Sequence, residues 1–208
     1  MTKDATIREI HHRVKNNLQT VAALLRLQAR RVDAPEARMA LEESVRRVAS
    51  IALVHETLSM SSDEVVEFDG IVDRVATAAT EVATTATTVK MRREGTFGVL
   101  PAEIATSLVM VLNELLINAV EHGFPEDEAP QSTAEVVVSA HRFRKQLHVT
   151  VADNGRGLPD GFTADAGGRL GLQIVRALAT GELRGTIELR NRAGGGTEAV
   201  FVVPLGKR

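Results

Sequence analysis

Apolar residues recur at helical spacing through the first 58 residues of the chain, with a break at Asp33-Ala34-Pro35. Over residues 7–32 they fall on one face of a helix, at Ile10, Val14, Leu18, Val21 and Leu25. A second helix begins near residue 36, because Asp33 can cap it and proline suits a first turn. The side chains of this helix that are expected to face inward are Leu41, Val45, Val48, Ala52 and Leu58. The pattern predicts an antiparallel helical hairpin over residues 1–62.

Two amphipathic helices cannot enclose a core of useful size by themselves. We therefore expect the hairpin to pair with a second copy of itself in a four-helix bundle, which makes the protein a homodimer. The first helix is also a basic rod, since residues 1–31 contain seven Lys or Arg against Asp4 and Glu9.

Strands and helices alternate after a polar stretch at residues 59–63, so a second domain is expected over residues 63–208. Strands are predicted at 65–68, 89–93, 135–143, 146–152, 186–190 and 197–203, and helices at 69–80, 101–121 and 170–179. This alternation is typical of an α/β sandwich. The fold class of the whole chain is therefore α+β.

Composition excludes several functional classes. The longest apolar runs, such as residues 104–112, are too short to cross a membrane, and the absence of cysteine excludes disulfides and thiolate metal sites. A net charge of -2, with no Trp or Tyr, argues against nucleic-acid binding. A cytoplasmic protein with no membrane or nucleic-acid partner is expected.

Two adjacent histidines lie in the first helix, within Glu9-Ile10-His11-His12-Arg13-Val14-Lys15-Asn16-Asn17-Leu18-Gln19. At 100° per residue His12 falls almost opposite the apolar stripe and should face water, whereas His11 lies nearer its edge. Imidazole has a free lone pair near neutral pH and can accept a phosphoryl group. Taken alone, a surface histidine pair is more often polar filler.

A carboxylate and a carboxamide stand four residues apart in Asn113-Glu114-Leu115-Leu116-Ile117-Asn118-Ala119. Glu114 and Asn118 therefore share a face of the helix predicted at 101–121, and the Asn118 amide oxygen can ligate Mg²⁺. By itself such a pair occurs on any solvated helix. His122 follows one turn later and is a candidate phosphate neighbour, while Gly123 could equally be a simple C-cap.

The segment Asp153-Asn154-Gly155-Arg156-Gly157 follows a predicted strand. Its carboxylate can accept a hydrogen bond from the exocyclic amine of adenine, while Gly155 and Gly157 let the backbone approach the base. A lone motif of this kind is usually just a turn. Downstream, the glycine-containing loop at 158–169 is expected to be a mobile lid over the nucleotide. Gly168, Leu170 and Gly171, around the start of the next helix, are candidate phosphate contacts, and Thr197 is a candidate nucleotide contact for which a hairpin turn is an equally good account.

Together and in this order, the three segments resemble the transmitter of a two-component sensor histidine kinase whose acceptor box is His-His-Arg-Val-Lys-Asn-Asn. The resemblance implies a dimerisation hairpin of the HisKA_2 or HWE-like type, followed by an ATP domain of the HATPase_c, GHKL (Bergerat) type. Within that branch the chain is most similar to soluble actinobacterial kinases that signal to an antitermination (ANTAR-type) response regulator.

The resemblance implies that Mg-ATP phosphorylates His12 and that the phosphoryl group passes to an aspartate of a response regulator. It makes Asn118 the Mg²⁺ ligand. Most such kinases have an acidic residue directly after the acceptor, but here that residue is Arg13, so we hypothesise that Glu114 positions or deprotonates His12. The common Gly-x-Gly-Leu-Gly-Leu pattern is also reduced to Gly168 and Gly171.

Other functions fit this pattern less well. Serine kinases of the anti-sigma type share the ATP fold but lack the acceptor hairpin. A non-catalytic phosphorelay or scaffold protein would keep the hairpin but lose ATP turnover, and chaperone-like or gyrase-like coupling is disfavoured by the small size. No sensory domain fits before the hairpin, so the input is expected from a segment outside this sequence or from a separate protein.

Overall fold

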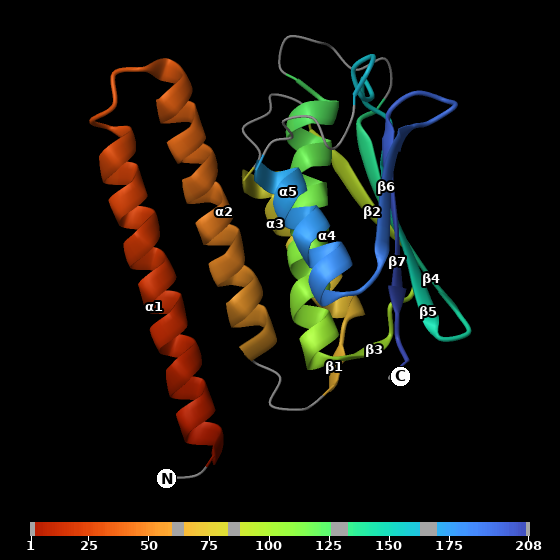
Figure 1. Ribbon diagram of the computed structural model, residues 1–208, viewed down its shortest axis with the longest axis horizontal. Coiled ribbons are helices and arrows are strands. Elements are labelled where there is room, and N and C mark those ends of the chain that lie inside the picture. Colours follow the sequence, from red (N-terminus) through yellow and green to blue (C-terminus); the bar gives the residue numbers. More distant parts are fainter. Residues whose placement is uncertain (1–2, 60–64, 83–87, 126–132, 163–169, 207–208) are drawn as a thin grey trace. The chain divides into compact units, whose positions relative to one another are not determined.

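A computed structural model describes residues 3–59, 65–82, 88–125, 133–162 and 170–206 (Figure 1). The chain divides into two compact units, Met1–Val66 and Glu67–Arg208, and each is described by itself. The predicted boundary between residues 62 and 63 falls outside the described residues.

The first unit is a helical hairpin of α1 (Lys3–Ala29) and α2 (Pro35–Ser59), which lie side by side (Figure 1). Pro35 begins α2, as expected of a residue that lacks an N–H and has a preset φ. The loop between the helices is held by Arg38, whose Nε and NH2 donate to the carbonyl oxygen of Val32 at 3.3 and 3.0 Å. The hairpin predicted from periodicity is present.

The buried seam of the hairpin is narrow. Ala22 and Ala29, seven residues apart on α1, are buried, whereas Val21, which belongs to the predicted apolar face of the same helix, is 44% exposed in the single hairpin. Small side chains at this spacing let α2 approach α1 closely, and one neighbouring helix covers only a narrow stripe of the α1 surface. The apolar side chains of Val21, Leu24, Leu27 and Met39 are left exposed within the hairpin.

The second unit is an α/β sandwich around a five-stranded sheet. Its helices are α3 (Asp69–Val82), α4 (Ala102–Gly123), α5 (Leu170–Arg176) and the π-helical turn η1 (Ala177–Glu182). Its strands are β2 (Lys90–Gly95), β4 (Glu135–Phe143), β5 (Gln146–Asp153), β6 (Thr186–Asn191) and β7 (Thr197–Pro204). Two short strands, β1 (Val65–Glu67) and β3 (Val99–Pro101), pair separately.

The strand order of the large sheet is β2-β4-β5-β7-β6, with β2 parallel to β4 and the other neighbours antiparallel. The helices α3, α4 and α5 cover one face (Figure 1). Burial alternates along β5, so that Leu147, Val149, Val151 and Asp153 are buried. Because Val151 and Asp153 are two apart, they lie on the same face of the strand.

Helix α4 is the central helix of this unit. Twelve of its residues are buried, including Asn113 and Glu114. It is the helix in the described ranges that is long and apolar enough to pass a length-and-composition test for a membrane span, but the core helix of a sandwich passes that test too. Its apolarity follows from contact with the sheet and with its neighbouring helices.

Two local features were not predicted. The strand β3 is only three residues long, too short for an alternation pattern to be visible. The last predicted helix continues through η1, where the backbone widens and Leu183 N donates to the carbonyl oxygen of Leu178 at 2.9 Å.

Candidate active site

A pocket of about 460 Å³ lies in the second unit. Helix α4, the end of β5 and the segment that follows β5 form most of its wall. Its lining residues are Leu115, Asn118, Ala119, His122, Gly123, Val151, Asp153, Arg156, Gly157, Leu158, Pro159, Asp160, Gly161, Phe162, Leu172, Leu189, Thr197 and Ala199. A cavity of this size, mostly apolar with a few polar groups, suits a nucleotide-sized ligand.

Asp153 is the buried acid of this pocket, only 4% exposed. Its Oδ1 accepts hydrogen bonds from the backbone N–H groups of Gly155, at 2.9 Å, and Thr197, at 3.1 Å. These bonds hold the carboxylate in one orientation and engage Oδ1. Burial raises the pKa of Asp153, although the two backbone donors, the charge of Arg192 and a hydrogen bond from the Thr197 side chain act in the opposite direction.

The turn after Asp153 packs directly on the end of α4. A Cβ built at Gly155 would overlap the carbonyl oxygen of Gly123, so no larger residue fits there. Arg156 donates from its backbone N to Gly123 O and from Nε to His122 O, each at 3.0 Å. The last carbonyl groups of α4 therefore find donors in this turn.

Asn118, on α4, lines the pocket together with Leu115 and His122. Its Nδ2 is buried and has no hydrogen-bond partner among the described residues. Because leaving a buried amide donor unsatisfied is costly, this atom is a sign that the pocket receives a polar ligand. The same side chain offers an amide oxygen of the kind that Mg²⁺ accepts beside phosphate oxygens and water.

Glu114 occupies the preceding turn of α4 and is 6% exposed, but it is not among the pocket-lining residues. Its spacing of four from Asn118 places both on one side of the helix, yet only the later residue reaches the pocket wall. Sequence spacing specifies a helix face and not the depth at which a cavity begins.

The other predicted site residues differ in their placement. Thr197 and Gly157 line the pocket. Gly155 does not line it, but its N–H donates to Asp153 and its backbone packs against Gly123, two residues that do. Leu170 begins α5 and Gly171 is buried within it, while the next residue, Leu172, lines the pocket. Gly168 falls outside the described residues, as does the greater part of the predicted lid, residues 163–169. His12 is part of α1, in the other unit, and its side chain is outside the described ones.

Sequence reasoning did not assign a role to Arg192 or Asn191. Arg192 donates from NH1 to the carbonyl oxygen of Asp153 at 2.7 Å, and Asn191 bonds to the backbone of Leu158. Asn191 ends β6 and Arg192 follows it, just before the run Gly194-Gly195-Gly196. The only available signal was that polar pair beside a glycine turn, which is common in hairpins.

Two protein families match this chain. Residues 9–83 match the family described as histidine kinase. Residues 103–207, half of the chain, match the family described as histidine kinase-, DNA gyrase B-, and HSP90-like ATPase.

Curated relatives cover the whole chain. The sensor histidine kinase PdtaS of Mycolicibacterium smegmatis is 55% identical over 208 residues, which is 100% of this chain and 41% of that protein. The PdtaS of Mycobacterium tuberculosis is 52% identical with the same coverage. The chain thus spans about two fifths of the length of these relatives.

Solved histidine kinase structures resemble this chain in fold. The histidine kinase domain of the blue-light activated kinase EL346 from Erythrobacter litoralis aligns with a TM-score of 0.65 and 26% identity, covering 97% of this chain and 92% of that one. The ATP-binding domain of PrrB from Mycobacterium tuberculosis aligns with a TM-score of 0.53 and 26% identity, covering 70% and 100%.

Proposed function

The chain belongs to the histidine kinase-, DNA gyrase B- and HSP90-like ATPase family, and we propose that it phosphorylates its own His12 with ATP. It combines a histidine kinase domain with a GHKL-type ATPase sandwich, the core of a two-component sensor histidine kinase. Because it spans only about two fifths of its curated relatives, the activity of the whole protein is part of this proposal.

The observation that carries the proposal is the fixed carboxylate of Asp153 on the pocket wall. Oδ1 accepts from the Gly155 and Thr197 amides, the Thr197 side chain also bonds to the carboxyl group, and Oδ2 is proposed to accept a further hydrogen bond from the exocyclic amine of adenine. Guanine has a carbonyl oxygen at the matching position. Two acceptor oxygens would then face each other without a hydrogen bond, which disfavours GTP. ATP is therefore the expected nucleotide.

Asn118 is the proposed Mg²⁺ ligand. The buried, unpartnered Nδ2 and the adjacent amide oxygen make this side chain a fit for a metal–phosphate group. Bound Mg²⁺ would supply neutralisation of charge on the phosphates. His122 and Arg156, which also line the pocket, are the nearby side chains that could contact phosphate oxygens.

In the proposed reaction an imidazole nitrogen of His12 forms a bond to the γ-phosphorus of ATP, and the bond from that phosphorus to the bridging oxygen of ADP breaks. The imidazole loses its N–H proton. Glu114 is proposed to accept or orient that proton, since the residue after the acceptor is Arg13 and supplies no base. Phosphohistidine then donates its phosphoryl group to an aspartate carboxylate of a response regulator, proposed to be of the antitermination (ANTAR) type.

The hairpin is proposed to dimerise. Its exposed apolar residues, Val21, Leu24, Leu27 and Met39, would complete a four-helix bundle with a second copy. A cytoplasmic location is also proposed, in keeping with the burial of the apolar α4 inside its unit.

The proposal is tested by incubating the purified chain with γ-labelled ATP and Mg²⁺. We expect acid-labile, base-stable label in the wild type and in His11→Gln, and none in His12→Gln or Asn118→Ala. Label retained in His12→Gln would disprove the acceptor assignment. ATP binding without label in the wild type would favour a requirement for an activator, and no ATP binding would favour a scaffold protein.

Glu114→Gln tests the proposed base separately. It should bind ATP with wild-type affinity but label His12 at least about 100-fold more slowly, the usual scale of general-base catalysis. Labelling at the wild-type rate would remove Glu114 from the mechanism.

A further inference from the structure

Asn191, the last residue of β6, holds the backbone of a residue 33 positions earlier in the sequence. Leu158 N donates to Asn191 Oδ1 at 2.6 Å, and Asn191 Nδ2 donates to Leu158 O at 3.2 Å. The two bonds use both polar groups of one amide and both polar groups of one residue's backbone. Such a reciprocal pair fixes the orientation of Leu158 as well as its position.

The contact also depends on Gly157. Its φ is +82°, and a Cβ built there would lie 2.8 Å from Asn191 Oδ1. A side chain at this position would therefore be strained and would press on the amide. Gly157 and Asn191 together therefore fix the direction of the backbone from the Asp153 turn to Leu158.

The path leads into a turn that forms part of the pocket wall. Phe162 N donates to Pro159 O at 3.1 Å, and Gly161 has a φ of +73°, as the third position of a type II turn requires. Every residue from Leu158 to Phe162 lines the pocket. Phe162 carries the only benzene ring among the pocket-lining residues of the described chain.

We propose that Asn191 is a positioning residue for the nucleotide: by holding Leu158, it keeps the turn 159–162 and the Phe162 ring against the pocket. This inference rests on the proposed ATP-binding function. Asn191 itself is not among the lining residues, so it acts through Leu158 and not by contact with the nucleotide. If only a fraction of the molecules has this wall in place, the apparent Kd for ATP equals the intrinsic Kd divided by that fraction.

Asn191→Ala is expected to raise the Kd for ATP about tenfold, a loss that two neutral hydrogen bonds of ordinary net strength can account for. Asn191→Asp keeps the acceptor for Leu158 N but opposes Leu158 O with a second oxygen, so its Kd should rise at least as much. Glu188→Ala is the matched control, because Glu188 is an exposed polar residue of the same strand and does not line the pocket. Its Kd should stay at the wild-type value.

The measurement is titration of the full chain with a fluorescent ATP analogue and Mg²⁺, beside the thermal unfolding midpoint without nucleotide. A role confined to stability would lower the midpoint of Asn191→Ala and leave its Kd unchanged, and that result would overturn the inference. If the wild type itself binds no nucleotide, the proposed function fails. If the wild type binds and both Asn191 variants bind equally well, only the positioning role fails.

A double-mutant cycle with Phe162→Ala identifies the route of the effect. If Asn191 acts through the wall that carries Phe162, the double variant should bind no more weakly than the weaker single variant. Fully additive losses in log Kd would show that the two side chains act independently and would overturn the proposed route.

Discussion

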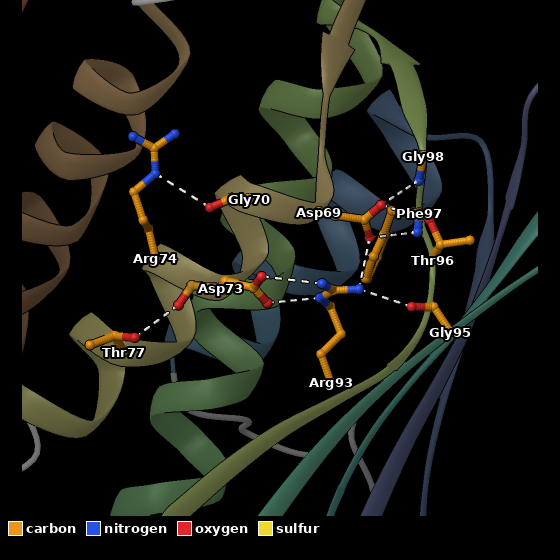
Figure 2. A network of polar contacts seen from close by, with 10 residues as sticks. All are labelled: Asp69, Gly70, Asp73, Arg74, Thr77, Arg93, Gly95, Thr96, Phe97 and Gly98. Carbon is orange, nitrogen blue, oxygen red and sulfur yellow. Dashed lines mark hydrogen bonds and ion pairs between the residues drawn. The ribbon is translucent and has the colours of Figure 1, made fainter.

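Replacing Asp69 by alanine should destabilise the ATPase unit far more than replacing Asp73, although both carboxylates bond to the same arginine. Asp69 is the first residue of α3. Its Oδ1 accepts from Phe97 N at 2.9 Å and Arg93 NH1 at 3.1 Å, and its Oδ2 accepts from Thr96 Oγ1 at 2.6 Å and Gly98 N at 3.1 Å (Figure 2). One carboxylate thus joins the start of a helix to the segment between β2 and β3.

Asp73 lies one turn further along α3 and makes fewer contacts. It accepts two hydrogen bonds from Arg93, at 2.7 and 3.1 Å (Figure 2). Its side chain is 52% exposed, against 19% for Asp69. Water can therefore replace its arginine partner at little cost.

The expected magnitudes follow from this difference. Asp69→Ala leaves the partly buried N–H groups of Phe97 and Gly98 without their acceptor, at about 1–3 kcal/mol each, so a total loss of about 3 kcal/mol is expected. Asp73→Ala removes an exposed ion pair, which is worth about 0–1 kcal/mol. Asp69→Asn should fall between the two, because an amide keeps one acceptor oxygen.

The assay is urea unfolding followed by far-UV circular dichroism, since the chain has no Trp or Tyr. Hydrogen exchange at the Phe97 and Gly98 amides gives a local readout, and both amides should exchange faster in Asp69→Ala. Equal destabilisation by Asp69→Ala and Asp73→Ala, or unchanged exchange at these amides, would refute the reasoning.

The dependence on pH provides a second check. Burial acts to raise the pKa of Asp69, but the bonds from Thr96, Phe97 and Gly98 and the charge of Arg93 outweigh it and lower the pKa below 3.8. A lowered folded-state pKa contributes stability above the unfolded value, and this is lost as the pH falls through the folded value. The gap between wild type and Asp69→Ala should therefore narrow below about pH 3.8. A gap that stays constant into this range would contradict the assignment.

Three further predictions concern the pocket. Asp153→Asn should weaken ATP binding at least about tenfold without lowering stability at pH 7, because an amide oxygen can still accept from the Gly155 and Thr197 N–H groups and carries no buried charge, whereas its NH2 group opposes the adenine amine; unchanged affinity by titration would contradict this. Since the pKa of Asp153 is raised above 3.8, ATP affinity should begin to fall at a higher pH than for an ordinary aspartate, and Asp153→Asn should lack this dependence. Gly155→Ala should cost about 1–3 kcal/mol of unfolding free energy and weaken ATP binding, because its Cβ overlaps Gly123 O; a wild-type melting curve would show that the turn can relax.

Much of the fold could be predicted from the sequence because it depends on local periodicity. The hairpin, the long α4 and the strands β4 to β7 all have apolar spacings that identify their elements. The position of Asp153 was also accessible, since the alternation of β5 continues from Val151 to this residue. The apolar face of α1 could be predicted, but which of its residues α2 covers could not: Val21 is 44% exposed within the hairpin, because periodicity identifies an apolar face and not the width that one neighbouring helix covers.

What the tertiary structure decided is which distant residues meet. Three contacts join residues that are far apart in the chain. They are the hydrogen bonds between Asn191 and Leu158, the close packing of Gly155 against Gly123, and the hydrogen bonds of Asp69. Likewise, Glu114 and Asn118 are four residues apart and lie on the same side of α4, but of the two only Asn118 lines the pocket. The sequence by itself determined the elements and the chemical groups that they carry, because backbone propensity and side-chain periodicity act over a few residues. The pocket formed by those groups depends on strand register and on the packing of helices against the sheet, which arise only when the whole unit folds.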